Sequence, residues 1–237
     1  EPDGSTFETG VASGVWNLQD QYDYKRGGNW PIAGNAAPRG LFFGGQEADA
    51  TRLDTIQFIV ITTTGNSQDF GDLTDTRGEI AGFSSSTRTV AAGGHALTGT
   101  RFNDQIEYVV NATLGNAIDF GDLSAARDSC AGFNSDTRGV VGGGQEGSTR
   151  KNIIEYVTIA NTGNATDFGD LTASSEDNTA VTNSTKMAIS LSNSASAIVN
   201  TIDQITIQTT GNATDFGDLS TARQSTGGAS SAHGGLS

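Results

Sequence analysis

Short segments of alternating apolar and polar residues recur along the chain at nearly constant intervals. The segments DTIQFIVI, DQIEYVVN, NIIEYVTI and NTIDQITI begin at Asp54, Asp104, Asn152 and Asn200. Each mixes β-branched or aromatic residues with polar ones, which is typical of a strand with one buried face. A Gly-Asn pair follows each segment and allows the chain to reverse. The pattern therefore predicts a β-hairpin in every repeat.

One octapeptide ends each predicted hairpin. The copies NSQDFGDL, NAIDFGDL and, twice, NATDFGDL begin at Asn66, Asn116, Asn164 and Asn212. The Asp of the Asp-Phe-Gly triplet recurs after 50, 48 and 48 residues. Internal repeats of this length are typical of arrays of supersecondary units.

Two further short apolar runs precede the hairpins. TRGEIAGFSSSTRTVAAGGH at 76–95 and ARDSCAGFNSDTRGVVGGGQ at 126–145 each contain two runs joined by a polar turn, and IAGNAAPRGLFFGGQ at 32–46 is their equivalent in the first repeat. Four strands per roughly 49 residues are typical of a propeller blade. We therefore expect an all-β chain with a β-propeller of about four blades at 32–225 and an N-terminal arm at 1–31. Residues 226–237 would start a further repeat or close the ring.

The third repeat, LSAARDSCAGFNSDTRGVVGGGQEGSTRKNIIEYVTIANTGNATDFGDL at Leu123–Leu171, resembles a kelch repeat. The matching positions are Arg127, the glycine cluster 142–144, Tyr156 and Phe168, although kelch repeats usually have Trp where Phe168 stands. In the fourth repeat KMAISLSN, from Lys186, replaces RGVVGGGQ. The resemblance implies a kelch-like propeller whose fourth blade is flatter or packs differently.

A second resemblance concerns biological context. Repeats of the form TTGNATDFGDL, at 209–219, resemble those of virion and tail-associated proteins of tailed bacteriophages, and so does SGVWNLQDQYDYKRGGNWP at 13–31. This resemblance implies a non-enzymatic structural protein of a phage virion, such as a tail, fibre or decoration component, or of a similar extracellular assembly. Such a protein would act as a scaffold for protein–protein interaction.

The alternative function is a lectin-like propeller that binds host-surface glycans during attachment. The connections EADATR at 47–52, ALTGTR at 96–101 and EGSTRK at 146–151 would then contact the sugar. They are polar but contain no aromatic residue on which a sugar could stack. This composition favours the scaffold over the lectin.

The net charge of the chain limits the classes of partner that it is expected to bind. The 237 residues include 13 Lys and Arg against 27 Asp and Glu, a formal charge of −14. This charge repels phosphate backbones and anionic lipid surfaces, so neither nucleic acid nor membrane insertion is expected. The expected partners are other virion or assembly proteins, copies of the same chain, or a host glycan, in a virion or extracellular location.

The Asp-Phe-Gly triplet is shared with protein kinases, but it occurs here four times without the other kinase motifs. The repetition instead predicts structural roles. We expect the aromatic rings to pack between adjacent blades and the glycines to adopt a conformation that other residues resist. These residues are Phe70, Phe120, Phe168 and Phe216, with Gly71, Gly121, Gly169 and Gly217.

Two Asp residues per octapeptide also invite a calcium hypothesis, because Ca²⁺ takes six to eight oxygen ligands. The candidates are Asp69, Asp72, Asp119, Asp122, Asp167, Asp170, Asp215 and Asp218. Their spacing matches no EF-hand, so the expected cofactor is none, with calcium as the alternative. An ion pair between an acid and Arg77, Arg127 or Arg223 is favoured instead, and it should be missing at Ser175.

No catalytic residue is assigned. His95 and His233 are the only histidines and suggest no Ser-His-Asp or Cys-His arrangement. Trp16 and Trp30 both lie in the N-terminal arm, and because Trp is enriched at interfaces they are candidate interface residues. The alternative is that they cap the propeller of their own chain.

Overall fold

A computed structural model describes residues 38–48, 51–96, 102–183, 185–194 and 197–230. The N-terminal arm with Trp16 and Trp30, and His233 near the other end, lie outside the described residues. The described part is all-β, with 21 strands and no helix, as the sequence predicts. None of it therefore forms a helix with the length and hydrophobicity needed to cross a membrane.

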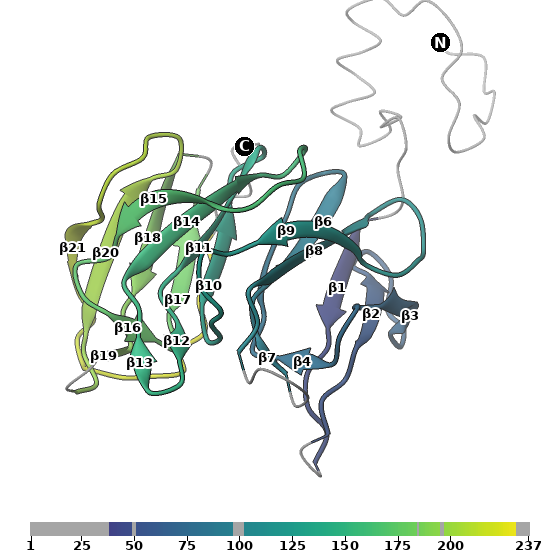
Figure 1. Ribbon diagram of the computed structural model, residues 1–237, viewed down its shortest axis with the longest axis horizontal. Coiled ribbons are helices and arrows are strands. Elements are labelled where there is room, and N and C mark those ends of the chain that lie inside the picture. The colour runs from purple at the N-terminus through teal and green to yellow at the C-terminus, as the bar shows by residue number, and fades with distance from the viewer. Residues whose placement is uncertain (1–37, 49–50, 97–101, 184, 195–196, 231–237) are drawn as a thin grey trace, which may run out of the picture.

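Four antiparallel sheets follow one another along the chain (Figure 1). Sheet 1 contains β1 (Arg39–Phe43), β2 (Thr55–Val60) and β3 (Gln68–Asp72). Sheet 2 contains β5 (Ala81–Ser84), β6 (Arg88–Ala92), β8 (Gln105–Val110) and β9 (Ile118–Asp122). Sheet 3 contains β10 (Ala131–Asn134), β11 (Arg138–Gly142), β14 (Ile153–Thr158) and β15 (Thr166–Asp170). Sheet 4 contains β17 (Thr179–Thr182), β18 (Lys186–Ser190), β20 (Thr201–Thr206) and β21 (Thr214–Asp218).

Three two-stranded sheets lie in the connections. They pair β4 (Arg77–Gly78) with β7 (His95–Ala96), β12 (Gln145–Glu146) with β13 (Thr149–Arg150), and β16 (Ser175–Glu176) with β19 (Asn193–Ser194). The predicted four-stranded sheet per repeat is confirmed for the second, third and fourth repeats. Sheet 1 has three strands, because the segment that aligns with a first strand lies within 32–37, outside the described residues.

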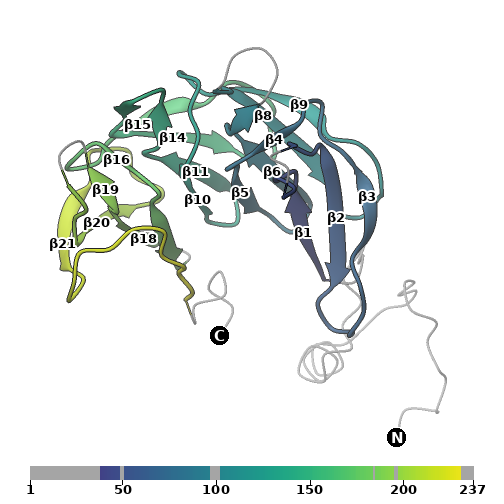
Figure 2. The ribbon, with the colours of Figure 1, turned by 90° about the horizontal axis from the view of Figure 1, so that it is seen from below.

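The four sheets stand side by side along an arc (Figure 2). The last strand of each repeat, β3, β9, β15 or β21, lies on the outer side of the arc. Sheets 1 and 4 form its two ends, which lie apart from each other. Within the described residues the sheets thus form an open arc, whereas the predicted propeller requires a closed ring.

The hydrophobic core is divided into three clusters, each between two neighbouring sheets. Ile56 and Phe58 of sheet 1 pack with Val109 of sheet 2, for example. The next cluster joins sheets 2 and 3, and the third joins sheets 3 and 4. No sheet buries both of its faces alone, so successive repeats depend on each other for stability.

The octapeptide phenylalanines occupy these clusters in three of the four repeats. Phe70, Phe120 and Phe168 are each 2% exposed. Each ring makes an edge-to-face contact with the aromatic residue of the preceding strand, at centroid distances of 5.9, 5.9 and 6.0 Å. The expected burial of Phe216 is wrong, since its side chain is 62% exposed. No further sheet among the described residues covers it, and Gln204 stands where Tyr156 pairs with Phe168 in sheet 3.

Each octapeptide contains a β-bulge. In sheet 1 the residue Ile56 pairs with Gly71 while Gln57 pairs with Asp69, so that Phe70 is the extra residue. The same shift occurs in the other three sheets. The bulge places Gly71 at a φ of 149°, a region that residues with a Cβ disfavour, and its three equivalents at 140° to 144°. The glycines of the octapeptide are therefore required by the bulge, as the sequence predicts.

The bulge also couples each repeat to the next. The Gly115 N–H donates to the Phe70 carbonyl over 2.8 Å, and the Ala117 N–H donates to the Asp72 carbonyl over 2.7 Å. The Asn116 side chain accepts the Asp72 N–H at 3.1 Å. Sheets 2 and 3, and sheets 3 and 4, repeat all three bonds. A Cβ on Gly71 would lie 2.4 Å from the Gly115 carbonyl oxygen, so the contact also excludes a side chain there.

The fourth repeat differs from the others mainly where its second strand ends. Gly93 and Gly94, and Gly143 and Gly144, adopt positive φ in the second and third repeats. A Cβ on Gly93 would lie 2.5 Å from the Arg127 carbonyl oxygen of the next repeat, so the next repeat imposes this glycine. Leu191 and Ser192 stand at these positions in sheet 4, which keeps the same strand order.

We predict that Phe168→Ala lowers the free energy of unfolding by about 3–5 kcal/mol, because it empties a buried aromatic site. Phe216→Ala changes the same octapeptide position at an exposed site and should cost less than about 0.5 kcal/mol. Urea unfolding followed by circular dichroism measures both. Equal losses in the two variants would contradict the assignment of Phe168 to the core.

Candidate interaction surface

An arginine at the start of the second strand links each sheet to its neighbour. Arg138 donates to the Ile207 carbonyl of sheet 4 over 2.8 Å, and its guanidinium lies 4.0 Å from the centre of the Tyr156 ring. Arg88 and Arg39 repeat this arrangement with the carbonyls of Ile159 and Asn111. Each pairs a cation–π contact with a charge-assisted hydrogen bond, both strengthened by partial burial.

A second arginine, in the connection that precedes each of sheets 2 and 3, is buried in an ion pair with the third strand of that sheet. Arg127 and Glu155 meet at 2.6 Å with almost no exposure, and Arg77 pairs with Glu107 in the same way. Burial lowers the pKa of Arg77, and the Glu107 charge opposes that shift. The pairing of arginine with an acid is thus confirmed at two positions. The partner is a glutamate on the third strand of the same repeat, 30 residues after Arg77 and 28 after Arg127, and not an octapeptide Asp.

In the fourth repeat, hydrogen bonds replace this ion pair. Ser175 stands where the arginine would be, and the predicted lack of an ion pair there is confirmed. The buried acid is Asp203, whose carboxylate accepts hydrogen bonds from the Thr172 N–H and hydroxyl at 2.8 and 2.7 Å. Burial raises the pKa of Asp203, and the two hydrogen bonds oppose the shift. Arg223 bonds instead to Thr221 and Ser220.

The octapeptide carboxylates, which are the calcium candidates, lie on the last strand of each sheet. In all four copies the first Asp is exposed, and the second is exposed or half-buried. Within the described residues none of the eight belongs to a group of three or more potential metal ligands. The repeated geometry therefore spaces these acids along the outside of the arc and does not gather them.

One group of three potential ligands does form, from Glu79, His95 and Asp128. Arg52 donates to His95 Nδ1 at 3.0 Å and to Glu79 Oε1 at 3.2 Å. Asp128 Oδ2 lies 3.7 Å from the same histidine nitrogen. The guanidinium thus bonds to two of the three groups, and the arrangement favours an ion-pair network over a metal centre.

Asp128 is the buried member of this network, with 1% exposure. Burial raises the pKa of Asp128 to about 7, and the neighbouring Glu79 carboxylate adds to the shift. Cys130 lies close by, and burial raises the pKa of its thiol to about 11, so it is a protonated structural residue.

The open face of sheet 4 forms an apolar surface at one end of the arc, with the exposed side chain of Phe216. We use this name for the side of sheet 4 that would contact a following repeat. It carries Phe216, Gln204 and Lys186, at the positions that hold Phe168, Tyr156 and Arg138 in sheet 3. Among the described residues only the segment 226–230 lies against this face, where Thr179 and Ser230 make hydrogen bonds to the opposite backbone.

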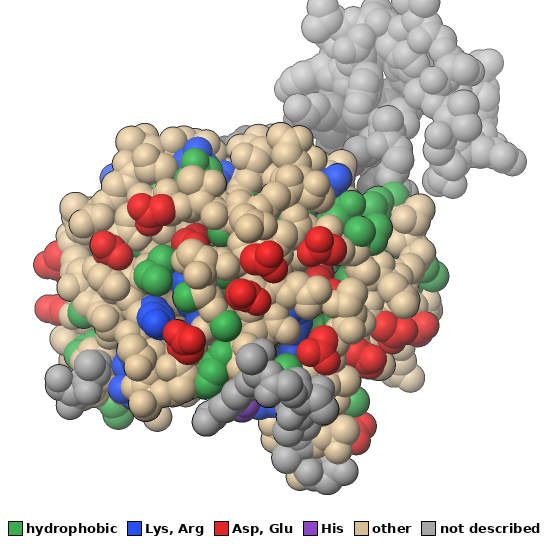
Figure 3. Space-filling view, viewed as in Figure 1, with side chains coloured by type: hydrophobic (Ala, Val, Ile, Leu, Met, Phe, Trp, Pro, Cys, Tyr) green, Lys and Arg blue, Asp and Glu red, His purple; other side chains and the backbone are tan. Residues whose placement is uncertain are grey.

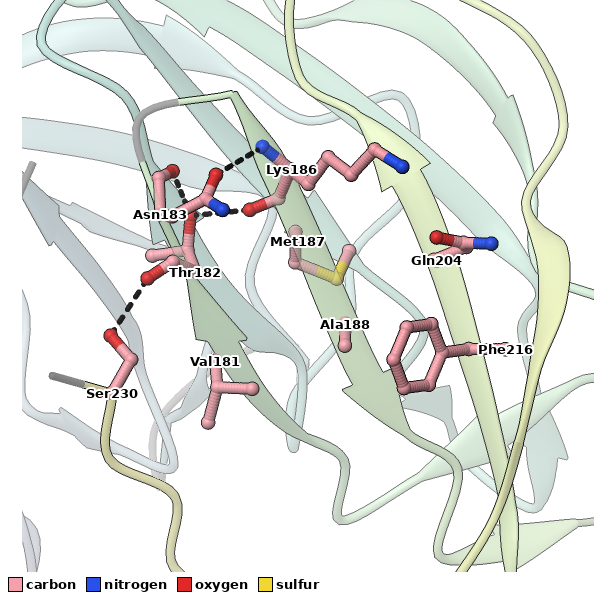
Figure 4. Close-up of a pocket in the computed structure, with 9 residues that line it drawn as sticks. All are labelled: Val181, Thr182, Asn183, Lys186, Met187, Ala188, Gln204, Phe216 and Ser230. Carbon is pink, nitrogen blue, oxygen red and sulfur yellow. Dashed lines mark hydrogen bonds between the residues drawn. The ribbon is translucent and has the colours of Figure 1, made fainter. Parts of the chain in front are cut away.

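A groove of about 280 Å³ runs across the open face (Figure 4). Phe216 and Gln204 project from neighbouring strands on one side, and Ser230 closes the other side through its bond to the Thr182 carbonyl at 2.7 Å. Lys186 extends along the rim without covering the ring of Phe216. The groove combines an exposed aromatic ring with amide, hydroxyl and ammonium groups, which suits a partner that is partly apolar.

The other end of the arc carries a complementary apolar surface on sheet 1. Phe42 and Ile61 are 59% and 64% exposed. At the equivalent positions Ile189 and Ile207 of sheet 4 are fully buried against sheet 3. On the face seen in Figure 3, acidic side chains are scattered over the surface without forming one patch. Among the described residues the exposed phenylalanines, Phe42 and Phe216, thus lie at the two ends of the arc, whereas exposed aliphatic side chains such as Ile118 also occur on an internal sheet.

No protein-family model matches this chain, and no curated protein matches it by sequence.

We predict that Glu155→Ala costs about 3–5 kcal/mol of unfolding free energy, because it strands the buried Arg127 charge. Glu146→Ala is the control, since Glu146 forms an exposed pair with Lys151 at 2.9 Å, and it should cost less than about 1 kcal/mol. Chemical denaturation measures both. A similarly small loss for Glu155→Ala would show that the Arg127 guanidinium reaches water.

We also predict that Asp128 makes stability depend on pH. Its folded pKa of about 7 exceeds the ordinary value of 3.8, so between these values the folded chain keeps a proton that the unfolded chain releases. Stability should therefore fall as pH rises, by at most about 1.4 kcal/mol per unit. Asp128→Asn removes this slope, and its advantage over the parent should grow from pH 4 to pH 7.

The control for that prediction is Asp136→Asn, which removes one exposed carboxylate from the same repeat. Urea unfolding of the three proteins at pH 4, 5, 6, 7 and 8 gives the comparison. An Asp128→Asn effect that stays constant across this range would contradict the prediction.

Proposed function

We propose that this chain is a non-enzymatic structural protein of a phage virion, or of a similar extracellular assembly, and that it acts as a scaffold for protein–protein contacts. Its sheets would be blades of a kelch-like β-propeller array. The resemblance of its repeats to those of virion and tail-associated proteins supports this context. The exposed apolar ends of the arc support the scaffold role.

The open face of sheet 4 is the observation that carries the proposal. Phe216 leaves 62% of its side chain exposed, whereas the three equivalent rings are buried by a following sheet. An exposed aromatic ring in an apolar groove is typical of a protein-binding surface. The buried ion pairs, by contrast, join the connection before a sheet to the third strand of that sheet, as Arg127 and Glu155 do. These charged residues stabilise the scaffold and are not arranged around a substrate.

One specific observation supports the glycan-binding alternative. The groove places the Phe216 ring on the same side as the Gln204 amide, with the Asn183 amide on the opposite side, and sugars stack on rings and bond to amides. The connections that were expected to contact a glycan give this alternative less support. Arg52 is buried and bonds to Glu79, so it is not available to a sugar.

Particle proteomics tests the proposal. The chain should co-purify with intact virions through a density gradient and occur in fixed stoichiometry to the other structural proteins. Its absence from such particles would contradict the virion assignment.

A glycan array probed with the purified chain distinguishes the lectin alternative from the scaffold. Binding to a defined glycan that is lost in Phe216→Ala and kept in Ile118→Ala, which changes an exposed aliphatic residue of β9, would favour the lectin. No binding above background would favour the scaffold.

A further inference from the structure

The two ends of the arc are the two halves of one contact that occurs three times inside the chain. Each internal contact joins the following face of one sheet to the preceding face of the next. Sheet 4 has an open following face, and sheet 1 presents its preceding face with Phe42 and Ile61 exposed. The structure of the internal contacts therefore defines what would fit between these ends.

The backbone groups at the two ends match. Inside the chain, the carbonyls of the bulged Phe and of the second octapeptide Asp accept N–H groups from the next Gly-Asn turn, as Phe168 accepts from Gly211. Sheet 4 offers the carbonyls of Phe216 and Asp218 for the same role. Sheet 1 offers the N–H groups of Gly65 and Ser67, which are the equivalent donors.

The side chains match as well. Asn66 is equivalent to Asn212, whose side chain accepts the Asp170 N–H at 3.1 Å. The Ile61 carbonyl is equivalent to the Ile207 carbonyl, which accepts a hydrogen bond from Arg138. Lys186 supplies a cation at the position of Arg138 and can donate to that carbonyl.

The segment 226–230 adds a further element to the open face. Its glycine Gly228 lies beside β17, where a Cβ would come within 2.7 Å of Thr179 and 2.9 Å of Val181. Gly132 of β10, at the equivalent position, packs on the backbone of β5, where a Cβ would come within 2.7 Å of the Gly82 carbonyl oxygen. The segment thus occupies the place of a first strand, while sheet 1 presents second, third and fourth strands, so together they make one four-stranded unit.

The residues that differ in the fourth repeat favour an association between chains that have already folded. Gln204 replaces an aromatic residue and Lys186 replaces an arginine, which makes the open face more tolerant of water than the internal faces. Phe216 is nevertheless present and exposed. A face with one aromatic anchor and a polar surround is typical of a protein–protein contact between separately folded units.

We propose that sheet 1 of a second copy of this chain docks on the open face of sheet 4, head to tail. The inference rests on the proposed scaffold function and names the partner. The contact is heterologous, so it continues until a ring closes or a filament forms. The curvature of the arc favours a closed ring (Figure 2).

Sedimentation velocity across a concentration series tests the contact, at about 0.15 M salt so that the net charge of each copy is screened. The parent chain should associate in a concentration-dependent manner. Phe216→Glu and Ile61→Glu should each weaken association about thirtyfold, which corresponds to about 2 kcal/mol. Ile118→Glu, which changes an exposed residue on an internal sheet, should behave as the parent.

Mixing the two end variants gives the decisive measurement. Phe216→Glu keeps an intact sheet 1 end, and Ile61→Glu keeps an intact open face, so an equimolar mixture should form a heterodimer with a single contact. Each variant alone should stay monomeric. Association that survives both substitutions, or a mixture that stays monomeric while the parent associates, would overturn the head-to-tail arrangement.

A gain of affinity provides a second test that does not depend on a disruptive variant. Lys186→Arg combined with Gln204→Tyr restores the cation–π pair of the internal contacts and should tighten association about tenfold. A parent and a restored variant that both remain monomeric at every concentration would overturn the inference. The proposed function would still stand if the chain were found in virions, and it would fail separately if the chain associated but were absent from them.

Discussion

The carbonyl group of the bulged phenylalanine is the acceptor on which the arrangement of the sheets depends. The bulge turns this carbonyl out of its own ladder, and the Gly-Asn turn of the next repeat donates to it. Only a residue without a Cβ can follow, because the next turn lies within 2.5 Å of that position in the second and third sheets. One octapeptide thus ends a strand, creates a bulge and fixes the neighbouring repeat, which is why the chain repeats it.

The charged residues follow from that coupling. With the sheets held side by side, long cationic side chains can reach the backbone of the next repeat, as Arg88 reaches the Ile159 carbonyl. The buried Arg127 and Glu155 instead join the connection before sheet 3 to β14 of that sheet, and leaving either one buried without the other would be strongly destabilising. The chain has few cations relative to its acids, yet five arginines make these contacts. Three of them reach a carbonyl of the next repeat, and two form the buried pairs. The basic residues therefore serve cohesion within and between repeats.

The sequence predicts the strands, the hairpins and the octapeptide glycines well, because alternation and tight turns are local properties. It fails where a property depends on a neighbour. Phe216 has the same local sequence as Phe168 but no following sheet among the described residues, so its burial could not be deduced from the octapeptide. The acid that pairs with Arg127 could not be named from the sequence either, since Glu155 lies 28 residues away on another strand. One sequence signal could have revealed the side chains that donate to the next repeat. It is the arginine that begins the second strand in three repeats and is lysine in the fourth.

In the fourth repeat, the residues that the sheet itself needs can be told apart from those that contact a following sheet. Its octapeptide keeps the bulge and the glycine, with Gly217 at a φ of 140°, because sheet 4 needs them for its own last strand. The residues that serve only a following sheet have changed, since Lys186, Gln204 and Leu191 replace an arginine, a tyrosine and a glycine. Phe216 belongs to this second group by its contacts, yet it is unchanged. A ring of this size that contributes little to the burial of its own sheet gains its stabilisation only when another surface covers it. The open face therefore combines a reduced dependence on a neighbour during folding with a retained capacity to bind one afterwards.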